Sequence, residues 1–404
     1  MSSPESPKLQ AASPKPQLRV ALVNRFFHRA GAVPTVVREW ADHLEAAGHE
    51  VVVFASDVDA TRSTARRTYV PVRVGRIKAF DLAGFAFAWR LSKAMSDFGF
   101  RVSDFNPQSA VRDPQFDALF CTDSTAYFGA WWACRRLRAP AIMAFQGWIF
   151  NPGKQGVYPR TVTWVYKLSV RFCARHAPMI ACINPEIHDG LRAMGAPEER
   201  LWLAPNCVDL GAWDTGKASA HQRAERQVLF VGRFSPEKGL RHLLEAMPLV
   251  LRRLPNVRAV VVGSDEAADG EYHALARRLG VAERVSFGGV VPRESLPKLY
   301  AEADILVVPS LAEGHPLAPI ESLASGTPVV GSDLPGLRMT VEEGASGLLV
   351  PPGDTAALAE AICRVLGDTA LLDRMTRAAR GSAERFAWPR RVAELEALVA
   401  RLRT

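Results

Sequence analysis

Long apolar runs are absent from this 404-residue sequence. A helix that spans a bilayer needs about 20 consecutive apolar residues, whereas the apolar runs here, such as residues 259–262, end after a few positions. We therefore expect no membrane-spanning helix. Residues 1–17 are rich in Ser, Pro, Lys and Gln and lack the apolar stretch of a secretory signal. They predict a disordered tail and a cytoplasmic protein.

Cysteine pairs are absent as well. None of the six cysteines forms a C-x-x-C pair, and the nine histidines show no metal-ligand spacing. Zinc sites and disulfide frameworks are built from such spacings. The sequence thus predicts buried, reduced thiols and no metal site.

Apolar residues make up 48% of the chain and charged residues 23%, a balance that allows a large buried core. At about 100 to 200 residues per domain, the length predicts two domains. Short apolar runs alternate with segments of helical spacing, which is typical of parallel sheets covered by helices. We expect strands at residues 18–23, 50–54, 118–121, 141–145, 179–183, 228–231, 257–262, 285–287, 305–308, 328–330 and 347–350. We expect helices at residues 35–47, 161–174, 240–251, 271–279, 296–301, 320–324 and 390–402.

The predicted fold is α/β, with two Rossmann-like, doubly wound parallel-sheet domains that face each other across a cleft. The first domain covers residues 18–207 and the second covers residues 208–385. Residues 386–404 form a last helix that packs back on the first domain. Doubly wound sheets bind ligands at the carboxyl ends of their strands, so we expect the functional residues there.

Positive charge is concentrated in the first half of the chain. The net charge is +9 over residues 1–207 and −1 over the remainder, within a total of +8. Residues 61–80 contain no acid and six basic residues, Arg62, Arg66, Arg67, Arg73, Arg76 and Lys78, and the aromatic stretch 80–89 follows. A solvated loop followed by a core helix is the favoured interpretation. The alternative, suggested by basic residues beside aromatic ones, is an anionic acceptor or peripheral contact with the inner face of a membrane.

The sequence Gly-Arg-Phe-Ser-Pro-Glu-Lys-Gly at residues 232–239 lies between a predicted strand and a predicted helix. Arg233 and Lys238 thus stand on a glycine-flanked loop. The following helix directs its N–H groups and the positive end of its dipole the same way. Two cations beside a helix N-terminus suit a diphosphate, although two solvated charges on a turn would give the same pattern.

The sequence Glu-Gly-His-Pro-Leu-Ala-Pro-Ile-Glu at residues 313–321 follows the predicted strand 305–308. Glu313 lies in the loop after the strand, and Glu321 lies about one turn into the next helix. One carboxylate can face the cleft while the other accepts hydrogen bonds from vicinal hydroxyls, as acidic residues do with ribose. A loop acid and a helix-surface acid near a positive helix end are the alternative.

These two motifs, with the trailing Ala-Ser-Gly-Thr-Pro-Val-Val at residues 324–330, closely resemble the C-terminal domain of family 4 glycosyltransferases. Those are retaining enzymes of the two-Rossmann-domain architecture called GT-B. The resemblance is weaker over the first domain, where it includes Ala-Gly-His-Glu-Val at residues 47–51. At residues 205–209 the chain has Pro-Asn-Cys-Val-Asp where the family has Pro-Asn-Gly-Val-Asp.

The resemblance implies that the substrate is a nucleoside-diphosphate sugar and that no cofactor is needed. Arg233 and Lys238 would hold the diphosphate, and the backbone of residues 316–318 would meet it from the other side. Glu321 would bind the ribose, Glu313 would face the transferred sugar, and residues 287–290 would contact the base through the backbone. The implied catalytic residues are Glu313, Arg233 and Lys238. The implied donor-binding residues are Arg233, Lys238, Gly288, Val290, His315, Leu317, Ala318 and Glu321.

The chain departs from the family in the first domain. Residues 29–34 read Arg-Ala-Gly-Ala-Val-Pro where the family has paired glycines, so only Gly31 is carried over to the acceptor or donor-sugar side. Gln146 stands where the family often has His. It cannot titrate, but its amide can hydrogen-bond a sugar hydroxyl. Asp57-Val58-Asp59 resembles the metal-binding Asp-x-Asp of the other large glycosyltransferase architecture, but it lies far in sequence from the donor motifs, so we expect no metal there.

The sequence thus predicts a metal-independent, retaining glycosyltransferase. A nucleotide-sugar epimerase of the same architecture is one alternative, and it would need no separate acceptor. A non-catalytic binder of sugar nucleotides or anionic polymers is another. Nucleic acid is not an expected partner, because the basic residues are not accompanied by a stacking platform or a recognised module.

Overall fold

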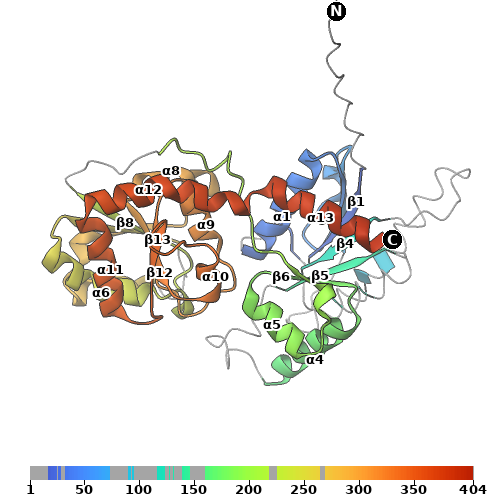
Figure 1. Ribbon diagram of the computed structural model, residues 1–404, viewed down its shortest axis with the longest axis horizontal. Coiled ribbons are helices and arrows are strands. Elements are labelled where there is room, and N and C mark those ends of the chain that lie inside the picture. The colour runs from blue at the N-terminus through green and yellow to red at the C-terminus, as the bar shows by residue number, and fades with distance from the viewer. Residues whose placement is uncertain are drawn as a thin grey trace, which may run out of the picture.

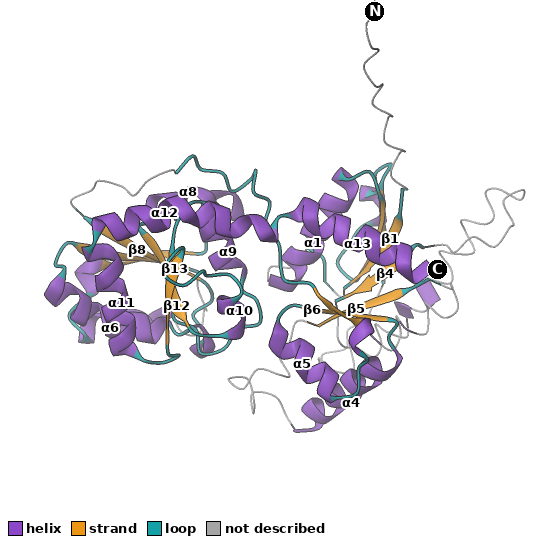
Figure 2. Cartoon of the chain, in the orientation of Figure 1, coloured by secondary structure: helices purple, strands orange, loops and turns teal. Residues whose placement is uncertain are grey.

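The computed structural model describes residues 17–24, 26–28, 32–72, 90–91, 93–94, 116–122, 127, 131, 139–145, 160–217, 225–263 and 269–403. These residues form two α/β domains, each built on one parallel sheet (Figure 1). Helices pack around both sheets, as the purple and orange segments of Figure 2 show. Within these ranges, no helix is long and apolar enough to cross a bilayer.

The first domain contains a parallel sheet of seven strands in the order β3-β2-β1-β4-β5-β6-β7. Its strands are β1 (Arg19–Val23), β2 (Glu50–Ala55), β3 (Arg67–Pro71), β4 (Ala118–Cys121), β5 (Ala141–Phe145), β6 (Met179–Cys182) and β7 (Leu201–Leu203). Its helices are α1 (Ala32–Ala46), α4 (Arg160–His176) and α5 (Pro185–Ala193). The central strands are buried on both faces, which is why they read as continuous apolar runs rather than alternating ones.

The second domain contains a parallel sheet of six strands in the order β10-β9-β8-β11-β12-β13. Its strands are β8 (Arg226–Val231), β9 (Val257–Val262), β10 (Val285–Gly289), β11 (Ile305–Val308), β12 (Val329–Ser332) and β13 (Gly347–Val350). Its helices are α6 (Leu240–Arg253), α7 (Asp269–Arg278), α8 (Leu296–Glu302), α9 (Leu317–Ala324), α10 (Pro335–Arg338), α11 (Thr355–Gly367) and α12 (Thr369–Ala383). The sequence pattern did not predict α10, α11 and α12.

Short 3-10 helices join several of these elements. They are η1 (Ala60–Arg62), η4 (Glu198–Arg200), η5 (Pro236–Lys238), η6 (Ala282–Arg284), η7 (Arg293–Ser295) and η8 (Glu384–Phe386).

In both sheets the strand order reverses at the first strand of the domain, between β1 and β4 and between β8 and β11. Ligands of doubly wound sheets bind at such a reversal, beyond the carboxyl ends of the strands. The predicted motifs at residues 232–239 and 313–321 follow β8 and β11, the two strands at the reversal of the second sheet.

The last helix, α13 (Trp388–Arg403), belongs to the core of the first domain. In Figure 1 it leaves the second domain and lies beside α1. Trp388 is 1% exposed, and its ring lies 5.0 Å from that of Trp40 on α1. The chain crosses between the domains twice, and the two crossings are paired, because the Val208 N–H donates to the Phe386 carbonyl at 2.9 Å.

The basic run at residues 61–80 corrects one expectation. A solvated loop is wrong for Arg67–Pro71, which form the edge strand β3 in parallel register with β2. Thr68, Tyr69 and Val70 are residue types that favour strands, and pairing with β2 outweighs the charge of the segment. Residues 73–89, which include the rest of the basic run and the aromatic stretch, lie outside the described part of the chain.

Candidate functional site

Glycines line the carboxyl ends of β8, β9 and β10. Gly263 has φ of 124°, and a Cβ atom there would lie 1.9 Å from the Gly232 carbonyl oxygen. Its N–H donates to the Gly289 carbonyl at 2.8 Å. Backbone rather than side chains therefore forms this edge of the second sheet. Gly288 and Val290, predicted to meet a base, lie on the same edge and are exposed, Val290 by 76%.

The loop at residues 232–239 packs directly on the end of β11. Gly239 adopts φ of 69°, and a Cβ atom there would lie 1.9 Å from the Pro309 carbonyl oxygen. The Leu311 N–H donates to the Glu237 carbonyl at 2.8 Å. The side chain of Arg233 is 66% exposed, and Nη2 lies 3.2 Å from Glu237 Oε1. The fold thus joins the two sequence motifs through their backbones and leaves Arg233 at the surface of the site.

Lys238 and Glu313 form an ion pair across these two loops. Nζ of Lys238 lies 2.7 Å and 2.9 Å from the two carboxylate oxygens of Glu313. The Ser310 hydroxyl donates to Glu313 Oε1 at 2.7 Å, and the Glu313 side chain is only 8% exposed. A fixed cation and a fixed carboxylate therefore lie side by side four residues before α9. The sequence placed both residues in the site but not in contact.

Glu321 has different partners from Glu313. Its Oε1 lies 2.7 Å from Arg293 Nη1, and Tyr300 donates its hydroxyl to Oε2 at 3.2 Å. The side chain is 4% exposed. Burial raises the pKa of Glu321, and the Arg293 guanidinium and the two hydrogen bonds oppose this rise. In this structure the carboxylate predicted to bind ribose is covered by Arg293.

Arg293 also reaches the first domain. Its Nη2 donates to Glu39 on α1, and its guanidinium lies 5.2 Å from the centre of the Trp213 ring. Burial raises the pKa of Glu39 to about 7; the Arg293 guanidinium opposes this rise, and the nearby Glu321 carboxylate adds to it. One guanidinium thus serves two buried carboxylates, one from each domain.

The imidazole of His315 faces the segment between the domains rather than the donor side. Asn206 N–H lies 3.0 Å from Nδ1, and Thr340 Oγ1 lies 3.1 Å from Nε2. Burial lowers the pKa of His315 to about 3, so the ring is neutral. Both ring nitrogens are engaged within the protein, so the imidazole is not available to a donor.

Leu317 and Ala318 form the first turn of α9. The side chain of Leu317 packs against a core cluster of the first domain, and that of Ala318 packs against one of the second. Their backbone N–H groups belong to a helix N-terminus, where such groups lack intrahelical partners. Gly31 and Gln146, predicted on the acceptor or donor-sugar side, lie outside the described residues.

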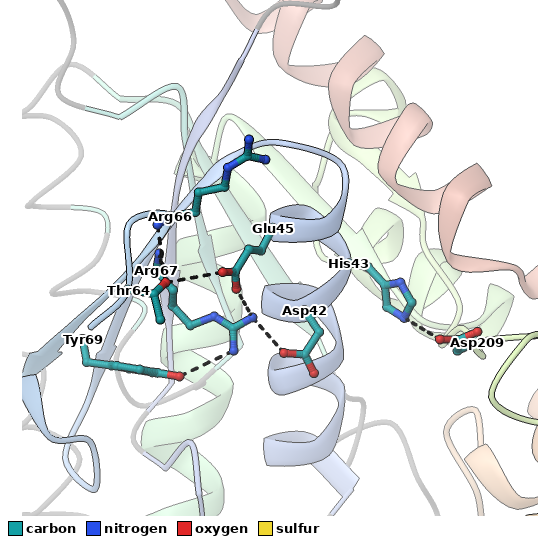
Figure 3. Close-up of polar contacts among 8 residues, drawn as sticks. All are labelled: Asp42, His43, Glu45, Thr64, Arg66, Arg67, Tyr69 and Asp209. Atoms are coloured by element: carbon teal, nitrogen blue, oxygen red, sulfur yellow. Dashed lines mark hydrogen bonds and ion pairs between the residues drawn. The ribbon is translucent and has the colours of Figure 1, made fainter. Parts of the chain in front are cut away.

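Three arginines of the basic run lie in the described part of the first domain, Arg62, Arg66 and Arg67, and carboxylates neutralise one of them, Arg67 (Figure 3). Arg67 lies 2.8 Å from Asp42 and 2.6 Å from Glu45, both on α1, and beside the Tyr69 hydroxyl. Arg62 and Arg66 are exposed. Arg67 therefore holds β3 to α1, and the charge available to a partner here comes from the other two arginines.

Asp57 and Asp59 serve the backbone. The two carboxylate oxygens of Asp57 accept from the N–H groups of Phe27 and His28 at 2.6 Å and 2.8 Å. Asp59 accepts from Thr61 N–H and caps the 3-10 helix η1. Among the described residues, no group of three or more His, Cys, Asp or Glu side chains is arranged to hold a metal ion.

The sequence did not single out two polar residues that connect the two domains. Arg293 follows β10 by four residues, and Asn184 follows β6 by two. Their positions just beyond strand carboxyl ends are a signal that could have singled them out. Their partners, however, lie in distant segments and could not be read from the pattern.

Two family models together cover most of the chain. The model described as glycosyl transferases group 1 matches residues 213–382, and a glycosyl transferase 4-like domain matches residues 31–207. D-inositol 3-phosphate glycosyltransferase of Nocardia farcinica is 36% identical over 222 residues, which are 52% of this chain and 49% of the relative. The chain thus spans about half the length of that relative. Phosphatidyl-myo-inositol mannosyltransferase of Mycobacterium leprae is 26% identical over 376 residues, 92% of this chain and 93% of the relative.

Solved structures share the fold. Sucrose-phosphate synthase from Thermosynechococcus elongatus matches with a TM-score of 0.79 at 23% identity, over 96% of this chain and 99% of that chain. Anabaena HepE in complex with UDP-glucose matches with a TM-score of 0.73 at 18% identity, over 95% of this chain and 100% of that chain. At these identities the likeness concerns the architecture of two facing Rossmann-like domains.

Proposed function

The chain belongs to the group 1 glycosyltransferases, and we propose that it moves a sugar from a nucleoside-diphosphate donor to an acceptor hydroxyl, with retention and without a metal ion. The observation that carries this proposal is the contact between Lys238 and Glu313, next to the N-terminus of α9. It brings a cation, a carboxylate and the N–H groups of a helix N-terminus, which lack intrahelical partners, to the strand reversal of the second sheet. That is the place where a doubly wound domain binds nucleotides.

The diphosphate needs compensating positive charge as it leaves. Lys238, the exposed Arg233 and the positive end of the α9 dipole supply this charge. In the transfer, the bond between the sugar C1 and the phosphate oxygen breaks, and the acceptor oxygen bonds to C1 on the same face. The acceptor proton passes to the departing phosphate oxygen. Glu313, held by Lys238 and Ser310, faces the sugar.

The remaining donor contacts follow from the same edge of the sheet. The base lies against the backbone of residues 288–290, where glycines leave space, and Glu321 accepts from the ribose hydroxyls. Access to Glu321 requires Arg293 to move from its carboxylate. Structures with UDP and UDP-glucose among the neighbours support a nucleotide sugar as donor. The family resemblance assigns Gly31 and Gln146, which lie outside the described residues, to the sugar or acceptor side.

The acceptor we propose is anionic, either free or displayed on a membrane. The positive charge of the first domain supports it, as do the names of two relatives, which specify D-inositol 3-phosphate and phosphatidyl-myo-inositol. Donor binding by the second domain does not need this charge. Near physiological ionic strength, the positive charge of the first domain is screened over about 8 to 10 Å, so it acts on groups that approach the surface.

The proposal is tested first by finding the donor. A panel of nucleotide sugars is screened by thermal shift, and the stabilising donor is incubated with and without inositol phosphates or vesicles that contain phosphatidylinositol. Acceptor-dependent release of nucleotide, with an α-linked product from an α-linked donor, supports a retaining transferase. Conversion of the donor sugar without an acceptor would instead support an epimerase, and binding without turnover would support a non-catalytic binder.

The diphosphate contacts are tested by Arg233→Ala and Lys238→Ala. A charge-assisted hydrogen bond contributes about 1.5 to 3 kcal/mol, so each variant should lose at least about tenfold in donor kcat/KM while it still folds. Arg233→Ala should retain its Tm, whereas Lys238→Ala should lower it, because it removes the partner of the buried Glu313 carboxylate. Arg253→Ala is the matched control, because Arg253 forms an exposed ion pair with Glu360 at the far end of α6. Near-native kinetics in both site variants would remove these residues from the site.

A further inference from the structure

Two asparagines hold consecutive carbonyl groups of the loop that connects Glu313 to α9. Asn184 Nδ2 donates to the Gly314 carbonyl at 2.8 Å, and Asn206 Nδ2 donates to the His315 carbonyl at 2.6 Å. Asn184 follows β6 of the first sheet, and Asn206 follows β7. The loop of the second domain is therefore held by hydrogen bonds from residues of the first.

Asn184 is buried and uses both ends of its amide. It is 1% exposed. Its Oδ1 accepts from the Ile187 N–H at 2.9 Å and caps α5, while its Nδ2 donates to Gly314. Ser and Asp also cap helices well, but Ser is one bond shorter and ionised Asp has no hydrogen to donate. The helix cap alone therefore does not require asparagine, whereas the bond to Gly314 does.

The Gly314 carbonyl is confined on its other side by Gly336. A Cβ atom on Gly336 would lie 2.1 Å from this oxygen, so α10 begins in direct contact with it. Gly314 directly follows Glu313, and α9 begins three residues later. The orientation of this carbonyl thus influences both the carboxylate that faces the sugar and the N–H groups that face the diphosphate.

We propose that Asn184 is a positioning residue for the donor site, which acts from the first domain by fixing the Gly314 carbonyl. The proposal rests on the proposed function, because it assumes that the loop meets a nucleotide sugar. Its consequence is that the donor loop takes its binding conformation only when the two domains are in contact. A movement that separates Asn184 from Gly314 releases the loop and weakens the hold on the nucleotide.

The test uses Asn184→Ser and Asn184→Asp, which keep the cap of α5 and lose the donor to Gly314. A neutral hydrogen bond contributes about 0.5 to 1.5 kcal/mol, so Asn184→Ser should raise the Kd of the nucleoside diphosphate and the donor KM about two- to tenfold. Asn184→Asp should raise them further, because a carboxylate would face a carbonyl oxygen. The acceptor KM should stay near that of the wild type in both variants, and the Tm should stay near that of the wild type in Asn184→Ser.

Asp368→Asn is the matched control. Asp368 caps α12 through the Leu371 N–H at 2.9 Å, so this variant exchanges Asp and Asn, in the opposite sense, at a helix N-terminus away from the site. It should leave the Kd unchanged. Wild-type donor affinity in both Asn184 variants would overturn the proposal. An equal rise of the acceptor KM and the donor KM, or a rise in Asn184→Ser that follows a loss of its Tm, would also overturn it, since either points to a merely structural role.

Hydrogen exchange separates this proposal from the proposed function. If no nucleotide sugar binds the wild type, the proposed function fails, but the contact itself can still be measured. The amides of residues 314, 315, 317 and 318 should then exchange faster in Asn184→Ser than in the wild type, while those of α12 should not change. Unchanged exchange at these four residues would show that Asn184 does not hold the loop.

Discussion

Glu39→Gln should make the stability of the protein less sensitive to pH. Glu39 lies on α1, its side chain is 17% exposed, and it shares Arg293 with Glu321 of the second domain. Burial raises its pKa from 4.5 to about 7. Glu39 and Glu321 compete for the Arg293 guanidinium. At neutral pH a fraction of the folded molecules therefore keeps a proton on one of these carboxylates, whereas the unfolded chain has released it.

The direction of the effect follows from this proton. Between about pH 5 and pH 7 the folded Glu39 is protonated while the unfolded Glu39 is ionised, so the free energy of unfolding falls as the pH rises. The fall ends once the folded group is also ionised, above about pH 8. The difference between 4.5 and about 7 corresponds to about 3 kcal/mol. Glutamine cannot ionise, so the variant should lack this part of the pH dependence.

The assay is urea unfolding of the wild type and the variant at several pH values from 5 to 8.5. The free energy of unfolding should fall by up to about 3 kcal/mol more in the wild type than in Glu39→Gln over this range. Glu45→Gln is the control for removal of a carboxylate from the same helix, since Glu45 pairs with Arg67 on the surface of the first domain. Equal losses in the wild type and Glu39→Gln would refute the reasoning and show that Arg293 neutralises Glu39 fully.

Three further predictions concern the donor site and the basic surface. Glu321→Gln should weaken the binding of the free nucleoside diphosphate in calorimetry, while Glu313→Gln should lower kcat with little change in nucleotide affinity; the reverse pattern would exchange their roles. Gly239→Ala should lower the Tm and donor affinity together, because its Cβ would meet a backbone oxygen at 1.9 Å; an unchanged Tm would contradict the close packing. Neutralising Arg62 and Arg66 together should raise the acceptor KM, or reduce binding to anionic vesicles at low salt, without affecting donor affinity. Unchanged values of both would make this an ordinary solvated surface.

Local patterns were sufficient for the framework of this fold. Strands of a parallel sheet are buried on both faces, so segments such as residues 257–262 stand out as short apolar runs. The expected and observed ends of that strand coincide. The positions of Arg233, Glu313 and Glu321 relative to β8 and β11 were equally predictable, because a motif that follows a strand lies at its carboxyl end. The fold class and the family could therefore be inferred from the sequence alone.

Contacts between distant segments were decided only by the folded chain. Glu39 and Arg293 are 254 positions apart, and Asn184 and Gly314 are 130 apart. Periodicity describes each segment by itself and carries no information about which loop of one domain meets which helix of the other. Arg67 shows the same limit: its run of basic neighbours indicated a solvated loop, but pairing of β3 with β2 brought it to two carboxylates of α1. The partners of a charged side chain depend on the packing of the elements, and so does its pKa.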